Sequence, residues 1–415
     1  SGGLTGSNGI LAVNADGTLT PAGGAFTLAN FGRVNFTAGQ AIAFSGTGSL
    51  TAGTANVVLT TPEVLVNAAA TQTLTTTGTL EILPGSGTAP TNAATNIGGA
   101  LTLTAAGIGD SGLIEALSGN VTLVATSGDI TLNSGAAIVA TGSRITLASL
   151  VEDTPGGTVS LVSQTGNVTL NPGSLINVAA AGNGFAGSLN IATAATATTT
   201  LNGTLDGAAA FNASGGSFSL STGSIIGNLP WNSGFTRSFE AAIYQPGDIA
   251  IPMGATLTSG NVLLVANQGS VIVNGTIDAS GPTGGTIQLY GAGITDGAGN
   301  TTGGVTINAG ASLLAYYTAP NANDPNYANG ATSLSANGGT ITLGTTGAPT
   351  TVGGVVQLNA DGSEKVAPGG SGTISVAPGA TINVSAGAGG IGGQVILRAP
   401  VTTDASGNKS VNVSF

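Results

Sequence analysis

The sequence predicts an all-β fold, namely a single elongated parallel β-helix, or β-solenoid, with a few loop excursions. The first observation behind this prediction is local, because β-branched residues alternate with polar ones in short runs bounded by glycine, asparagine or serine. The second is that these runs recur along the chain. The third is composition, since 71 of the 415 residues are glycine without the every-third spacing of collagen.

The strand-like runs recur at fixed distances. A Gly-x-(Val/Ile)-x-(Leu/Val) run begins nine residues before the next one in three places, at Gly119 and Gly128, at Gly157 and Gly166, and at Gly260 and Gly269. The second pair follows the first by 38 residues, which we interpret as two turns of a repeat of about 20 residues. On this interpretation residues 1–415 form one continuous solenoid of on the order of 20 coils.

Composition excludes several classes of function. The chain is 41% apolar, which argues against disorder, and it contains no Cys and no His, so thiolate, imidazole and zinc chemistry are excluded. We expect no cofactor. The net charge is −11 and the six basic residues are scattered, which argues against nucleic acid as a partner. No run of about 18 apolar residues occurs, so membrane insertion is not expected.

In chain order, residues 1–60 contain four phenylalanines in strand-like runs, which we expect inside the first coils: Phe26, Phe31, Phe36 and Phe44. Between residues 100 and 227 the repeat is most regular, with triplets of two apolar residues around Thr, Ser or Asn. They start at Leu101, Val121, Ile130, Ile145, Val159, Val168, Leu189 and Phe218. The apolar pair of each triplet is predicted to point inward and the middle residue outward. Loop excursions are expected at 84–98, 229–250 and 316–332.

The last two excursions concentrate the large aromatic residues. They contain the only Trp and four of the five Tyr. We predict a contact patch for another protein or for sugar rings, made of Trp231, Phe235, Tyr244, Tyr316, Tyr317 and Tyr327. The alternative is that these segments fold back and cover a gap on the solenoid's own surface.

Both ends of the chain read as strands without charged or helical caps. An open terminal coil is an exposed sheet edge that recruits other chains. We therefore predict head-to-tail self-association through the strands that contain Ile10, Leu11, Val13, Val411, Val413 and Phe415. The alternative is a segment of a longer solenoid whose caps lie outside it.

Two further motifs carry no chemistry. Residues 387–392 match the Gly-x-Gly-x-x-Gly pattern of dinucleotide-binding proteins. Because a strand follows them instead of a helix, we interpret them as a turn. The aspartates Asp129, Asp206, Asp278 and Asp296 are isolated and do not form the calcium-binding nonapeptide of β-rolls, so no metal site is expected.

Three motifs follow one another along the chain: Gly-(Asn/Asp)-(Val/Ile)-Thr-Leu, then Gly-Ala-(Ala/Ser/Thr)-(Ile/Leu), then Gly-Gly-Thr-Ile-x-Leu. This succession resembles the filamentous-haemagglutinin-like family of bacterial surface proteins across most of residues 100–415. The resemblance implies a right-handed parallel β-helix, export by two-partner secretion, an extracellular or outer-surface location, and a role as adhesin or surface fibre with host or biofilm glycans or proteins as partners.

Three function classes remain, and a non-catalytic structural or adhesive surface rod that assembles into an extracellular filament is favoured. A polysaccharide-cleaving enzyme requires converging carboxylates, and the nearest acid pairs are Glu152 with Asp153, Asp110 with Glu115, and Asp361 with Glu364. An ice-binding solenoid requires Thr on one flat face, and Thr-rich stretches occur at 71–79 and 193–200.

Overall fold

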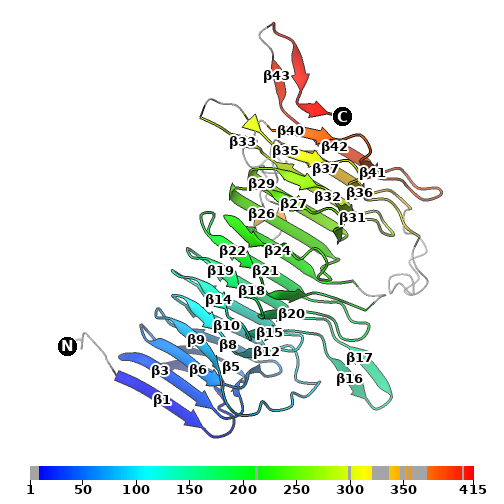
Figure 1. Cartoon of the computed structure of the whole chain (residues 1–415). Coiled ribbons are helices and arrows are strands. Elements are labelled where there is room, and N and C mark those ends of the chain that lie inside the picture. The colour runs from blue at the N-terminus through cyan, green and yellow to red at the C-terminus, as the bar shows by residue number, and fades with distance from the viewer. Residues whose placement is uncertain are drawn as a thin grey trace. The chain divides into compact units, whose positions relative to one another are not determined.

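The computed structural model describes residues 9–210, 214–297, 301–319, 336–345, 351–352, 355–356, 372–403 and 406–415. Every regular element in these residues is a β-strand, and most strands pair in parallel in long sheets (Figure 1). The chain divides into two compact units, residues 1–218 with 225–234 (unit 1) and residues 219–224 with 235–415 (unit 2). The predicted fold class, an all-β parallel β-helix, is confirmed.

Unit 1 winds through three parallel sheets, named here 1A, 1B and 1C in the order in which a coil visits them. Sheet 1A contains β1 (Gly9–Ala15), β3 (Phe31–Ala38), β6 (Asn56–Thr61), β9 (Leu80–Pro84), β11 (Ile108–Asp110), β14 (Ile130–Leu132), β19 (Val168–Leu170) and β22 (Thr198–Leu201). Sheet 1B contains β4 (Ile42–Phe44), β7 (Val64–Val66), β12 (Leu113–Glu115), β15 (Ala137–Val139), β20 (Leu175–Asn177) and β23 (Thr204–Asp206). Sheet 1C contains β2 (Gly24–Thr27), β5 (Thr47–Thr51), β8 (Thr71–Thr75), β10 (Ala100–Ala105), β13 (Asn120–Ala125), β18 (Thr158–Ser163) and β21 (Ser188–Thr193).

Unit 2 is built in the same way from sheets 2A, 2B and 2C. Sheet 2A contains β27 (Ile249–Ile251), β30 (Val271–Val273), β35 (Gly304–Ile307), β40 (Thr373–Val376) and β45 (Val413–Ser414). Sheet 2B contains β28 (Thr256–Thr258), β31 (Thr276–Asp278), β36 (Ser312–Leu314) and β41 (Thr381–Asn383). Sheet 2C contains β26 (Ser238–Pro246), β29 (Asn261–Gln268), β32 (Thr286–Gly291), β37 (Thr340–Gly344) and β42 (Gln394–Arg398). In sequence, β24 (Ser217–Thr222) and β25 (Ser224–Gly227) lie where the chain passes between the units.

In the part of the chain that the structure describes, four antiparallel pairs are separate from these sheets. They are β16 (Arg144–Leu147) with β17 (Leu150–Asp153), β33 (Ile294–Thr295) with β34 (Thr301–Thr302), β38 (Thr351–Val352) with β39 (Val355–Val356), and β43 (Val401–Thr403) with β44 (Lys409–Val411). The β16–β17 hairpin projects away from the coils of unit 1 (Figure 1). The triplet at Ile145 belongs to this hairpin, so its assignment to the coil was wrong.

The strand register corrects the predicted repeat length. Val121 of β13 pairs directly with Val159 of β18, so the whole segment between them forms one coil and not two. The nine-residue spacing instead connects consecutive strands of one coil, such as β13 and β14. Coils vary in length because loops are inserted at the corners. Leu101 pairs with Val121 across a short coil, whereas Ile341 pairs with Val395 across a much longer one.

The predicted alternation of the triplets is confirmed on sheets 1A and 1C. Val121 and Leu123 are buried and Thr122 lies between them on the outside. Because the strands pair in register, equivalent side chains stack in columns, and the core is a set of such columns of Val, Ile and Leu. Each coil buries little by itself, so its stability comes from the coils on either side.

Tight corners join sheets 1A and 1B. Gly135 and Gly173 occupy equivalent corners with φ of 88° and 85°, a left-handed conformation that glycine adopts without steric cost. Asn133 and Asn171 precede them, and each carbonyl accepts a hydrogen bond of 3.0 Å from the backbone N–H three residues later. The Asn171-Pro-Gly sequence is therefore a corner turn.

The phenylalanines of the first coils are not all internal. Phe44 is fully buried, Phe31 and Phe36 are half-buried, and Phe26 is exposed. Phe26 lies in β2, which pairs on one side only, with β5. The prediction that all four fill the core was therefore wrong for Phe26, because its strand is at the edge of its sheet.

The three expected excursions differ in extent. Residues 85–98 leave the coil between β9 and β10 and are fastened back to unit 1, since Asn96 Oδ1 accepts from the backbone N–H of Ala68 and Ser143 Oγ donates to Ala94 O at 2.7 Å. The excursion expected at 229–250 is shorter, because β26 and β27 return residues 238–246 and 249–251 to the coil. Of residues 316–332, the structure describes only 316–319.

Candidate functional site

The last strand of sheet 2C leaves apolar side chains of core type uncovered. Val395 and Leu397 of β42 occupy the same columns as Ile341 and Leu343 of β37. The inner pair is 0% exposed, whereas Val395 is 43% and Leu397 37% exposed. The residue type and register are the same, so the difference is due to the absence of a following strand among the described residues.

The first strands of unit 1 show the same effect. Phe26 of β2 stacks on Leu50 and then on Leu74 of β8, and exposure rises along this column from 0% at Leu74 to 55% at Phe26. On sheet 1A, Leu11 of β1 is half-buried although its column partner Val34 is fully buried. Among the described strands, each of these edges has a neighbour on one side only and carries apolar side chains, which is the pattern that accepts another strand.

The residues predicted to join subunits fall into two groups. Leu11, Val13 and Val413 lie in core columns, since they align with Val34, Phe36 and Ile374. Ile10 aligns with the exposed Arg33 and lies on the outer face. Val411 is part of the antiparallel β44, and Phe415 follows β45. Both are exposed, but neither is in a column.

Sequence reasoning missed Phe26, Val395 and Leu397 as edge residues. Phe26 was assigned to the core, and the strand expected after residues 387–392 was not distinguished from an inner strand. An edge strand and an inner strand have the same sequence pattern of apolar and polar residues. Only the pairing shows which strand has no neighbour.

The residues of the predicted aromatic patch are divided between the two units. Phe235 is buried in unit 2 and is unavailable to a partner, which corrects its assignment. Trp231 is half-buried in unit 1. In unit 2, Tyr244 of β26 is exposed and its hydroxyl accepts a bond of 3.3 Å from Ser221 Oγ. Tyr327 lies outside the described residues.

Tyr316 and Tyr317 are half-buried and follow β36. Tyr317 forms an isolated bridge with Gly281, and its N–H donates to Ser385 O at 2.9 Å. Its ring lies against Gly387, where a Cβ atom would overlap the ring carbon Cδ1. This contact supports the alternative in which these aromatics cover the solenoid's own surface. Residues 387–390 form a turn, as predicted, since Gly390 N–H donates to Gly387 O at 3.0 Å.

Two carboxyl groups lie in the core of unit 1. Asp110 of β11 is 0% exposed and aligns with Ile82 on one side and Leu132 on the other. Its Oδ1 accepts a bond of 2.9 Å from Gly112 N–H, while its Oδ2 has no hydrogen-bond partner. Burial raises the pKa of Asp110 to about 7, and the bond from Gly112 opposes this rise.

Glu63 precedes β7 and is 2% exposed, and its Oε2 also has no hydrogen-bond partner. Burial raises the pKa of Glu63 to about 7, and the carboxylate of Glu115 contributes to the rise. Both side chains are buried, and their raised pKa values mean that each holds its proton below about pH 7.

The other two acid pairs named from the sequence are Glu152 with Asp153 and Asp361 with Glu364. Asp153 forms a two-bond ion pair with Arg144 at 2.8 and 3.0 Å, and Asp361 and Glu364 lie outside the described residues. The part of the chain that the structure describes contains no group of three or more Asp or Glu residues arranged to hold a metal ion.

In the same part of the chain no helix is long and apolar enough to cross a membrane. No family model, no curated protein and no solved structure matches this chain.

Proposed function

We propose that the chain is a structural and adhesive rod of the bacterial cell surface that associates head to tail into an extracellular filament. The observation that carries this proposal is the uncovered pair Val395 and Leu397, whose column partners one coil earlier are completely buried. The cost of leaving such side chains in water is of the order of 1 kcal/mol each. A further coil placed on β42 removes it.

The edge strands near the two ends of the chain both carry partly exposed apolar side chains, so each can pair with the other. In the proposed contact β42 pairs with β2 of the next copy, and β45 pairs with β1. Leu397 and Val413 then meet Phe26 and Leu11 as a continuation of the apolar columns. This contact is heterologous, because it joins different surfaces of the two copies, and it does not close on itself. Repetition of the contact builds a filament.

The resemblance to filamentous-haemagglutinin-like proteins supports the cell-surface part of the proposal. A parallel β-helix is the fold which that resemblance implies. Membership of the family, right-handed winding, export and extracellular location are parts of the proposal. The half-buried and exposed aromatics Trp231, Tyr244, Tyr316 and Tyr317 are its candidate contacts for host or biofilm glycans or proteins.

Electron microscopy and sedimentation of the purified chain over a range of concentrations test the assembly. The wild type is expected to form unbranched filaments as the concentration rises. Val395→Glu and Leu397→Glu place a charge in the contact and should leave single particles. Val151→Glu is the matched control, because Val151 is similarly exposed but lies on the β16–β17 hairpin. Dispersed wild-type particles at high concentration would refute the proposal.

Ice binding is a second candidate, and one observation on sheet 1C favours it. The outward middle position of consecutive strands carries a hydroxyl five times in register: Ser49, Thr73, Thr102, Thr122 and Ser160. A parallel column, Thr51, Thr75 and Thr104, runs beside it. The columns repeat about every 4.8 Å across strands and are about 6.7 Å apart along them, a regular array that orders water.

Thermal hysteresis measurements test this second function. The wild type should inhibit ice growth, and Thr73→Lys with Thr102→Lys should abolish the effect by disrupting the array. Thr131→Lys on sheet 1A is the control and should retain it. Ordinary freezing behaviour of the wild type would eliminate this candidate.

A further inference from the structure

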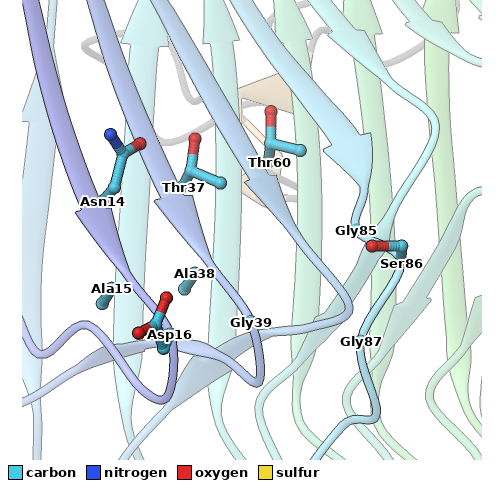
Figure 2. A pocket seen from close by; sticks show the side chains of 10 residues that line it. All are labelled: Asn14, Ala15, Asp16, Thr37, Ala38, Gly39, Thr60, Gly85, Ser86 and Gly87. Carbon is cyan, nitrogen blue, oxygen red and sulfur yellow. The ribbon is translucent and has the colours of Figure 1, made fainter.

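A pocket lies in unit 1 where the strands β1, β3 and β6 end. Its volume is about 310 Å³. Figure 2 shows the side chains that surround it, with Asn14, Thr37 and Thr60 in a row on the three strands and Asp16 and Ser86 around the same space. The complete lining is Asn14, Ala15, Asp16, Thr37, Ala38, Gly39, Thr60, Gly85, Ser86 and Gly87.

One wall of the pocket follows from strand register. Asn14 of β1 aligns with Thr37 of β3, and Thr37 aligns with Thr60 of β6, so the three side chains form one column on the outer face of sheet 1A. Their spacing is therefore about 4.8 Å. This column offers one amide and two hydroxyls along a line, at a spacing that the backbone fixes.

The opposite wall is made by the loop excursion after β9. Gly85 packs against Pro62, where a Cβ atom would be 2.7 Å from the proline ring, and Gly87 packs against Gly39, where a Cβ atom would overlap the carbonyl oxygen. Only glycine allows these approaches. The loop thus crosses back over the turn after β6 to reach the turn after β3, and this crossing brings Ser86 to the pocket.

The polar side chains of the pocket are available for a ligand. Asn14, Asp16, Thr37, Thr60 and Ser86 line the pocket, and none of them is among the described residues with a side-chain hydrogen bond to the protein. Asp16 is the only charged residue in the lining. The pocket therefore combines a carboxylate that accepts hydrogen bonds with hydroxyl and amide groups that both donate and accept.

We propose that this pocket binds a neutral saccharide. The Asp16 carboxylate accepts hydrogen bonds from two adjacent hydroxyls of a sugar ring, and the Asn14, Thr37, Thr60 and Ser86 side chains bind the remaining hydroxyl and ring oxygens. The carboxylate disfavours uronates, sulfated sugars and phosphates because like charges repel. A volume near the lower limit for ligand pockets suits one or two pyranose rings.

The lining contains no aromatic side chain on which a sugar ring could stack. Recognition therefore depends on hydrogen bonds alone, and we expect a Kd of about 1 mM for a single disaccharide. This inference does not depend on head-to-tail assembly. The pocket is a defined site for a sugar, whereas the candidate aromatic contacts for glycans lie apart along the chain in both units.

Saturation-transfer NMR with the full chain tests the site. The probes are the methyl glycosides of glucose, galactose and mannose, maltose and cellobiose, and methyl glucuronide as the charged comparison. At least one neutral probe should receive saturation from the wild type, and the glucuronide should receive much less. Asp16→Ala should weaken binding about tenfold or more, as expected for loss of hydrogen bonds to a charged group, and Thr60→Val should weaken it about two- to tenfold, as expected for loss of a neutral hydroxyl.

Thr169→Val is the matched control, since Thr169 is also an outward threonine of sheet 1A but lies on β19, away from the pocket. It should bind as the wild type does, and circular dichroism should show the same β spectrum for all variants. Absence of binding to every neutral probe would overturn the proposal. Equal binding by Asp16→Ala would also overturn it, because the sugar would then bind elsewhere. Binding of Ca²⁺ without binding of any sugar would overturn it too, because the pocket would then be a cation site. All these variants should still form filaments. A loss of sugar binding with filaments intact therefore concerns the pocket and not the head-to-tail contact.

Discussion

At the scale of single residues, the mainly aliphatic core of unit 1 contains two buried carboxyl groups, those of Asp110 and Glu63. Asp110 stands in a column of aliphatic side chains, between Ile82 and Leu132, and has one carboxyl oxygen without a hydrogen-bond partner. Burying a charge there is unfavourable, and the raised pKa shows that the protein keeps this group protonated in mildly acidic solution. The periodicity predicted an inward side chain at position 110. It did not predict the electrostatic consequence, because that depends on enclosure by neighbouring coils.

The stability of unit 1 should therefore fall as the pH rises. The pKa of Asp110 is about 7 in the folded chain and near 3.8 in the unfolded chain, so between these values the folded state binds more protons. Its contribution is fully present below about pH 4 and is lost as the pH rises to about 7. Asp110→Asn keeps the acceptor for Gly112 and removes the titration. We expect this variant to be more stable than the wild type at pH 8 by about 2–4 kcal/mol, and to have a flatter stability profile.

Urea unfolding at pH 5 and pH 8 measures this effect. Glu81→Gln is the control, because Glu81 is the exposed outward residue beside Ile82 on the same strand. Its profile should match the wild type. If Asp110→Asn loses stability with pH as steeply as the wild type, the dependence has another origin, and Glu63 is the next group to replace.

At the scale of elements, identical sequence patterns form different structures. Ile145-Thr-Leu has the same letters as Ile130-Thr-Leu, yet the first lies in an antiparallel hairpin and the second in the coil. The hairpin is closed at its base, where Thr154 N–H donates to Ser143 O at 2.8 Å and Ser143 N–H donates to Thr154 Oγ1 at 2.8 Å. Arg144 and Asp153 form an ion pair in the next position. The hairpin is thus an insertion in a corner and is not a part of the coil.

Removal of this hairpin should leave the solenoid folded. Replacing residues 144–153 by Asn-Gly retains Ser143 and Thr154 and joins them with a two-residue turn that suits an antiparallel pair. We expect the β spectrum to be unchanged and the loss of stability to be small, because loop shortening has a small entropic effect and the hydrogen bond that Asn183 N–H donates to Asp153 Oδ2 at 2.9 Å is removed. Circular dichroism with urea unfolding measures both. Loss of cooperative unfolding would show that the hairpin is needed for coil packing.

At the scale of the whole molecule, the exposed edges determine the expected behaviour. The described strands β1, β2, β42 and β45 each pair on one side only, whereas inner strands pair on both. Edge residues such as Leu397 are therefore partly exposed although their column partners are buried. Burial of these edges by another copy is the physical basis of the proposed filament.

The midpoint of thermal unfolding should consequently depend on protein concentration. Association stabilises the folded chain by mass action, so the midpoint should rise by about 2 °C for each tenfold increase in concentration. Leu397→Glu should remove this dependence, and Val151→Glu should preserve it. Differential scanning calorimetry provides the measurement, and a wild-type midpoint that is constant over three or so decades would contradict end-to-end pairing.

The sequence by itself determined the fold class and the orientation of most side chains. Alternation with period two follows from strand geometry, so Val121 and Leu123 are buried and Thr122 is outside wherever the strand is placed. Which strand pairs with which was decided only in the tertiary structure. Coil length depends on what is inserted at the corners, and this is why the segment from Val121 to Val159 is a single long coil. The edge positions of Phe26 and Leu397, the enclosure of Asp110 and the pocket beside Asp16 all depend on pairing between distant segments, which no local pattern encodes.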